Sequence, residues 1–180
     1  MPETDGPIAI IPIGQFDDDL LKSVANTVAA AFGRAVQLGK ALPLPKYAFN
    51  PSRAQYHSAA ILKRVETIKS SDWEAVVGVC DVDLFVPDVP FIFGEADRST
   101  RAAVISTARL RPDLGGLEAR NETTARRLSS EVIHQLGLIR GLAHCPNNRC
   151  VMFLSSSVAD TDKRGAQFCA NCKKRLVNER

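Results

Sequence analysis

Four of the five cysteines in this 180-residue chain lie in its last 36 residues, and their spacing limits what that region can fold into. Cys145 and Cys150 enclose four residues, Cys169 and Cys172 enclose two, and 18 residues separate the pairs. Two short hooks joined by a loop are the usual pattern of a tetrahedral zinc site with four thiolate ligands. A closed site of this kind leaves no position for water, so we expect one structural zinc ion there.

Cysteine usage and the N-terminal sequence also indicate a compartment. An odd number of cysteines, mostly clustered near one end, favours metal binding in a reducing environment over a disulfide framework. Cys80 lies in the apolar run Ala75 to Val82, where it is expected to be a small buried hydrophobe. The apolar run Ile8 to Ile13 is too short for a signal peptide or a membrane span. We therefore expect a cytoplasmic protein with no membrane partner.

The charge balance argues against nucleic acid as a partner. The chain has 23 basic and 20 acidic residues and is 45% hydrophobic, which is ordinary for one folded domain. A one-sided basic stripe is missing, and no aromatic platform accompanies the basic residues near the C-terminus. A zinc module that binds DNA or RNA would have to use these cations, which are Lys163, Arg164, Lys173, Lys174, Arg175 and Arg180.

Residues 1–120 have the pattern of an α/β unit. A strand at Pro7 to Ile13 precedes an amphipathic helix that starts at Asp17 to Asp19 and ends at Gly33. A second helix is expected to begin at Asn50 and Pro51, a cap followed by proline. Four short β-branched-rich strands follow, at Ala75 to Val79, Asp83 to Val86, Val89 to Phe93 and Ala102 to Thr107. Pro87 just before the third strand and Pro90 within it favour an edge position for that strand, because proline cannot donate to the ladder.

Residues 121–180 are expected to form a helix and a small cysteine-rich subdomain, and the two parts together form one domain over 1–180. Arg109 to Arg120, with its Gly115-Gly116 pair, is predicted to be a surface loop. Asn121 is a suitable helix cap, and Ala125, Leu128, Val132 and Leu136 then form an apolar helical stripe.

This helix runs into a segment that matches part of the pattern H-E-x-x-H-x-x-G-x-x-H. In that pattern the histidines bind a catalytic zinc ion and the glutamate acts as general base. His134 fits the first ligand, Gly141 the turn and His144 the third ligand. Met152 follows at a position suited to the methionine turn beneath such a site.

Two chemical groups of the pattern are missing. Gln135 stands at the position of the general base and Leu138 at that of the second ligand. Glutamine cannot accept the proton of a zinc-bound water, and general-base assistance contributes roughly 10² to 10⁴ in rate. Leucine cannot coordinate zinc, whereas a catalytic zinc ion normally has three protein ligands. We therefore expect no retained catalytic residue, and His134 and His144 to be remnants of a second zinc site.

The run His144-Cys145, four residues, Cys150-Val151-Met152, then Phe168-Cys169 and Cys172 resembles the archaemetzincin family of zinc metallopeptidases. The segments Phe91 to Ala96 and Ser106 to Leu110 also resemble the central strands of that family. The resemblance implies an α/β (α+β) fold with a mixed twisted sheet and flanking helices. It also implies a metzincin-like active-site helix ending near Gly141 and a small C-terminal subdomain with a four-cysteine zinc site.

Besides the nucleic-acid-binding zinc module described above, two functions are compatible with these residues. The first is a proteolytically inactive, zinc-stabilised protein that binds a peptide or protein segment, with Val89 to Phe93 as an edge strand for strand addition. The second is an active zinc metallopeptidase with a substitute ligand and base. Glu131, one helical turn before Gln135, is the nearest carboxylate in sequence for that role. One zinc ion per chain is expected in the first case and two in the second.

Overall fold

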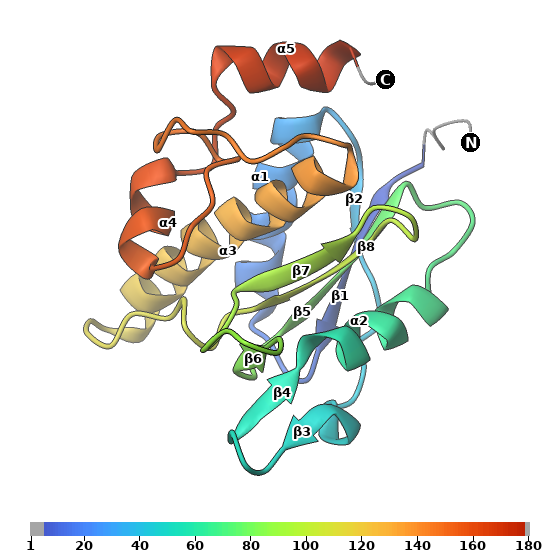
Figure 1. The fold of residues 1–180 in the computed structure, drawn as a ribbon, viewed down its shortest axis with the longest axis vertical. Coiled ribbons are helices and arrows are strands. Elements are labelled where there is room, and N and C mark those ends of the chain that lie inside the picture. The colour runs from blue at the N-terminus through green and yellow to red at the C-terminus, as the bar shows by residue number, and fades with distance from the viewer. Residues whose placement is uncertain (1–5, 179–180) are drawn as a thin grey trace.

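The computed structural model describes residues 6–178 and is built around a five-stranded sheet (Figure 1). The strand order is β2-β1-β5-β8-β7, and only β7 runs antiparallel to its neighbour. β7 is therefore an antiparallel edge strand on an otherwise parallel sheet. The strands are β1 (Ile8–Ile13), β2 (Val36–Leu38), β5 (Ala75–Cys80), β7 (Gly94–Asp97) and β8 (Ala102–Ser106).

Helices cover both faces of this sheet (Figure 1). α1 (Asp18–Phe32) and α3 (Leu117–Ile139) pack on one face, and α2 (Ser58–Thr67) packs on the other. β1 and β5 are buried along their whole length because they carry helices on both sides. A buried ion pair between Arg140 and Glu74, with bonds of 2.7 and 2.9 Å, ties the end of α3 to the start of β5.

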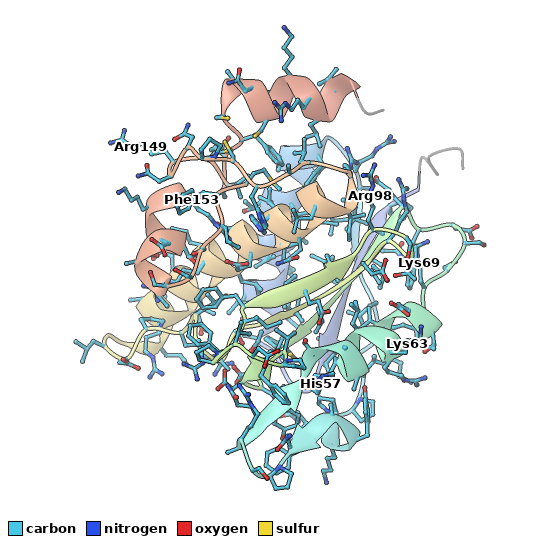
Figure 2. All side chains as sticks on the ribbon, viewed as in Figure 1. His57, Lys63, Lys69, Arg98, Arg149 and Phe153 are labelled. Atoms are coloured by element: carbon cyan, nitrogen blue, oxygen red, sulfur yellow. The ribbon has the colours of Figure 1, made fainter. Side chains whose placement is uncertain are left out.

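A second, three-stranded sheet lies beside the main one. It contains β3 (Phe49–Asn50), β4 (Gln55–His57) and β6 (Leu84–Phe85), in the order β3-β4-β6. A short 3₁₀ helix, η1 (Lys46–Ala48), leads into β3. His57, at the end of β4, lies near the lower end of the molecule in Figure 2, far from the loop that carries Arg149 and Phe153.

The C-terminal part adds two helices, α4 (Val158–Arg164) and α5 (Ala170–Asn178). α4 packs beside α3, and α5 extends across the top of the molecule in Figure 1. Within residues 6–178, no helix is both long enough and apolar enough to cross a lipid bilayer.

The expected mixed sheet with flanking helices is confirmed, and so is the first helix. The side chain of Asp17 accepts hydrogen bonds from the N–H groups of Asp19 and Leu20, and Gly33 ends the helix with φ of 61°. The predicted start of the second helix at Asn50 and Pro51 is wrong. The Asn50 side chain instead caps a turn by accepting from Ser52 and Arg53, and Ala54, with φ of 53°, separates this turn from β4.

Two further boundaries differ from the prediction. Val89 to Phe93 is irregular, with a single bridge from Ile92 to Leu84, and the edge strand begins after it at Gly94. α3 begins at Leu117, directly after Gly116, and not at Asn121. Glu118, Ala119 and Arg120 are good helix formers, so the helix extends back through them. Residue 121, where the C-terminal part was expected to begin, therefore lies inside α3.

Candidate active site and metal centre

The three residues that match the histidine pattern come together at the end of α3. The helix ends at Ile139, and Gly141 adopts φ of 92°, a conformation that favours glycine. Hydrogen bonds from Gly141 N–H to Leu138 O (2.9 Å) and from Leu142 N–H to Gly137 O (3.0 Å) close this turn. The chain then returns so that the His144 ring stacks on the His134 ring, with centroids 5.4 Å apart and planes inclined by 17°.

The tautomer of His134 follows from its hydrogen bond. Its side chain is buried, and Nδ1 lies 2.8 Å from the carbonyl oxygen of Val151. Because a carbonyl only accepts, Nδ1 carries the proton and Nε2 keeps its lone pair. Burial lowers the pKa of His134 to about 4, and the neighbouring Arg164 cation adds to this shift. His134 is therefore neutral at physiological pH.

The two altered positions of the pattern lie on the same helix. Gln135 is buried and lines the cavity beside His134. Its Nε2 would lie 3.2 Å from a Cβ added at Gly94, so the start of β7 packs closely on this side chain. Leu138 is partly buried and packs against the main core. Neither side chain offers a zinc ligand or a general base.

Met152 occupies the position expected of a methionine turn. It is fully buried, and its Sδ would lie only 2.4 Å from a Cβ added at Gly137. The absence of a side chain at Gly137 therefore lets the thioether pack directly on α3. Cys145 N–H donates to Met152 O at 2.9 Å, which links this turn to the cysteine site.

A buried ion pair lies next to His134. Arg164 of α4 contacts the Glu131 carboxylate at 2.5 Å and donates to Ser130 Oγ (3.0 Å) and Phe153 O (2.8 Å). Arg164 Nη1 also lies 3.2 Å from His134 Nδ1, but both atoms carry hydrogen, so this contact is not a hydrogen bond. Burial raises the pKa of Glu131 and lowers the pKa of Arg164, and their mutual contact opposes both shifts.

These residues line a cavity of about 440 Å³, which we call the cleft. One wall is the irregular segment Val89–Phe93, and the other comes from α3 and the loop before α4. The cleft is lined by Val89, Pro90, Phe91, Ile92, Phe93, Gly94, Glu131, His134, Gln135, Leu154, Ser155, Ser156 and Arg164. Its surface is mostly apolar, with a polar group of α3 and α4 residues at one side.

The four cysteines also come together, as their spacing predicts. Their Sγ atoms all lie within 4.8 Å of one another, and those of Cys145 and Cys169 are 3.9 Å apart. Four thiolates at the usual Zn–S length of about 2.3 Å have sulfurs about 3.8 Å apart, so this set fits a tetrahedral ion. The N–H groups of Met152 and Cys169 point at Cys150 Sγ, at 3.5 and 3.3 Å. Arg149 lies on the connecting loop (Figure 2).

The histidine site does not fit a catalytic zinc ion in the same way. Among the described residues, no other group of three histidine, cysteine or carboxylate side chains converges as the four cysteines do. Glu131, the carboxylate suggested as a substitute, accepts from Arg164 and from Thr161 (3.5 Å) and is 2% exposed. Two imidazoles alone fall short of the three protein ligands that a catalytic zinc ion normally has.

Sequence reasoning missed the role of Arg164. Arg164 is one of the cations that a nucleic-acid-binding surface would have to use, but it is fully buried in its pair with Glu131. Arg180, counted in the same group, lies outside the described residues. Nothing in the local sequence pairs Arg164 with a residue 33 positions away. Cys80, by contrast, is buried in the core as expected.

The fold and the site together define a zinc metallopeptidase scaffold of the metzincin type. The sequence matches peptidase family M54 over residues 24–178. It is 38% identical over 169 residues to the archaemetzincin of Methanocaldococcus jannaschii, covering 94% of this chain and 92% of that protein. It is also 38% identical over 176 residues to that of Thermococcus kodakarensis, covering 94% and 95%.

The structure is similar to the crystal structure of archaemetzincin from Methanopyrus kandleri. The TM-score is 0.84 at 28% sequence identity, covering 99% of this chain and 97% of that one. The chain therefore belongs to the archaemetzincin family, as the motif comparison predicts.

Proposed function

We propose that this protein is a zinc-stabilised archaemetzincin that does not hydrolyse peptide bonds and uses its cleft to bind a peptide or protein segment. The observation that carries the proposal is the donor set at the end of α3. His134 and His144 face each other, but Gln135 and Leu138 stand where the base and the second ligand belong. Without these groups the site lacks the means to hold zinc tightly and to deprotonate water.

The single zinc ion of the protein is proposed to bind Cys145, Cys150, Cys169 and Cys172. Four thiolates fill the coordination sphere, so this ion supplies folding energy and no chemistry. The ion would join the loop after α3 to the start of α5, two segments with little apolar core of their own. Because the thiols must stay reduced, we propose the cytoplasm as the compartment.

Peptide binding is supported by the free edge of β7. Ser106 N–H donates to Phe93 O, and antiparallel pairing alternates along the strand, so Glu95 and Asp97 also face β8. Gly94 and Ala96 then direct their backbone groups outward, where the described residues offer no strand partner. An extended segment could pair there while its side chains enter the adjoining cleft.

The alternative is an active metallopeptidase in which Glu131 replaces a missing group. This alternative is supported by the position of Glu131, which lines the cleft together with His134. However, its carboxylate is held by the buried Arg164 guanidinium, and freeing it for a metal or a water would leave that cation unpaired. Binding of nucleic acid has less support still, because Arg164 is unavailable to a ligand on the surface.

A random peptide library tests the proposal in two assays on the zinc-loaded protein. Display selection followed by fluorescence polarisation should yield peptides that bind, and mass spectrometry of the incubated library should show no cleavage. Binding of the selected peptides should be lost when Phe93, which lines the cleft, is changed to a charged residue. Cleavage that disappears in Glu131→Gln would establish the alternative, and failure to select any peptide would remove peptide binding from the proposal.

A further inference from the structure

The wall segment, Val89–Phe93, has few backbone hydrogen bonds of its own. Pro90 has no N–H group, and Asp88 adopts φ of 69°, so the chain cannot continue β6 into a regular strand. Within the segment, Ile92 N–H donates to Leu84 O at 3.0 Å and Val89 N–H makes a long contact of 3.5 Å with Val86 O. The carbonyl groups of Val89 and Pro90 must therefore find donors outside the segment.

Those donors are Arg53, in the turn before β4, and Gln55, the first residue of β4. Arg53 Nη2 donates to Val89 O at 2.7 Å and to Pro90 O at 3.2 Å. Arg53 Nε donates to Gln55 Oε1 at 2.9 Å, and Gln55 Nε2 donates to Pro90 O at 2.8 Å. The Arg53 guanidinium also lies over the Phe85 ring, 4.3 Å from its centroid. The planar Arg53 guanidinium thus binds two consecutive carbonyl groups, and its own position is fixed by Gln55 and the Phe85 ring.

The same network reaches the aromatic end of the wall. Gln55 Nε2 also donates to Asp83 at 3.0 Å, and Asp83 accepts two bonds from Arg109, at 2.6 and 2.8 Å. The Arg109 guanidinium lies over the Phe91 ring, 4.1 Å from its centroid, and Phe91 packs edge-on against Phe93. Both the backbone and the rings of the wall are therefore held by side chains from outside it.

We infer that Arg53 is a positioning residue for the cleft, one that fixes the Val89–Phe93 wall in the shape that receives a peptide. The effect of Arg53 on peptide binding rests on the proposed function. Its effect on the order of the wall can be measured without any ligand. It also explains why the wall cannot offer its own carbonyls for strand addition at Val89 and Pro90, since Arg53 and Gln55 already use them. Backbone pairing is left to β7, which begins at Gly94.

Lysine cannot replace arginine fully at this position. A guanidinium donates from several nitrogens in one plane and stacks on a ring, whereas an ammonium is a single point donor. Arg53→Lys should therefore hold the Val89–Phe93 wall in part, and Arg53→Ala should no longer hold it. Arg64→Ala is the matched control, because Arg64 is an exposed arginine on α2 that bonds Thr67 of its own helix.

Hydrogen exchange of the zinc-loaded, peptide-free variants gives the first readout. Arg53→Ala should raise exchange at the amides of Val89 and of residues 91–93 by about tenfold, with little change elsewhere and a thermal midpoint within a few degrees of the parent. The exchange rate in Arg53→Lys should lie between those of the parent and Arg53→Ala, and the rate in Arg64→Ala should match that of the parent. Unchanged exchange in the wall, or a rise spread evenly over the chain, would overturn the inference.

Affinity for peptides selected by the parent from a random library gives the second readout. Arg53→Ala should raise Kd about three- to tenfold, as expected for the loss of charge-assisted hydrogen bonds, and Arg53→Lys should recover part of this. Equal affinity of parent and Arg53→Ala would refute the positioning role. If the parent selects no peptide, the proposed function fails, while the exchange result still decides whether Arg53 holds the wall.

Discussion

Arg164 contacts the carboxylate of Glu131 at 2.5 Å, and this fully buried pair forms one side of the cleft next to His134. The pair joins α4 to α3, and Arg164 also donates to the carbonyl oxygen of Phe153, the residue after Met152. It thereby holds the C-terminal segment against the helix that carries the histidine motif. Glu131, the carboxylate nearest in sequence to Gln135, is therefore committed to this structural contact.

Breaking the Arg164–Glu131 pair should destabilise the protein. Arg164→Met leaves Glu131 buried without its partner, and the free energy of unfolding should fall by about 3–5 kcal/mol. The double variant Arg164→Met with Glu131→Leu should be more stable than the single variant, because no buried charge remains. Urea unfolding of the zinc-loaded proteins measures both values. A single variant as stable as the parent would show that the two charges do not depend on each other.

Removal of one cysteine ligand should release the zinc ion and destabilise the region after Cys145. Cys172→Ala leaves three thiolates, so the metal content should fall well below one per chain and the thermal midpoint should drop by several degrees. Cys80→Ala is the control, since it removes a buried thiol far from the cluster and should keep the full metal content. Elemental analysis and calorimetry provide the measurements. The structural role is wrong if Cys172→Ala keeps its zinc and melts with the parent.

Much of the C-terminal site could be predicted because its information is local. The cysteine spacing and the order of His134, Gly141 and His144 depend on short loops and on one helical turn. Arg164 could not be placed in this way, because its partner Glu131 lies on another helix and its own neighbours suggest a solvated surface. Only packing of α4 on α3 decides that this arginine is buried.

The wall of the cleft, Val89–Phe93, differs from its predicted structure for a related reason. Val89 to Phe93 is rich in residues that favour strands, so propensity predicts a strand there. In the structure its carbonyls at Val89 and Pro90 bind Arg53 and Gln55, which lie more than 30 residues earlier. Long-range side-chain donors thus replace the ladder that the local pattern suggests.

His134 should remain neutral well below the usual pH range of histidine. Its pKa in the folded protein is about 4, against about 6.5 for an exposed histidine. The unfolded chain therefore takes up a proton near pH 6.5 that the folded chain does not, so this residue lowers stability as pH falls from about 6.5 to about 4. The loss should reach about 3 kcal/mol and change little below pH 4.

Nitrogen-15 NMR of the imidazoles tests this directly. The His134 signals, assigned by their absence in His134→Gln, should show a protonated Nδ1 and an unprotonated Nε2 at neutral pH and should hold that pattern to about pH 5. The difference in stability between parent and His134→Gln across the same range isolates the effect from acid loss of zinc, which both proteins share. Titration of His134 near pH 6.5 would contradict the burial of its ring.

Restoring the two missing groups should restore the second metal site. In Gln135→Glu with Leu138→His, the new side chains join His134 and His144 on α3 and its following turn. A second zinc equivalent should bind, since coordination needs only side-chain placement. Hydrolysis of a mixed peptide library is the further readout, and it also requires an aligned substrate and an oriented water. The single variant Leu138→His separates the gain of a ligand from the gain of a base.

The number of zinc ions bound by the unaltered protein tests the central claim most directly. Elemental analysis of protein purified with zinc and dialysed should give one equivalent per chain, lost in Cys172→Ala and unchanged in His134→Ala. Two equivalents in the parent, with one of them and any peptidase activity lost in His134→Ala, would contradict the claim and establish that another residue has replaced the missing ligand.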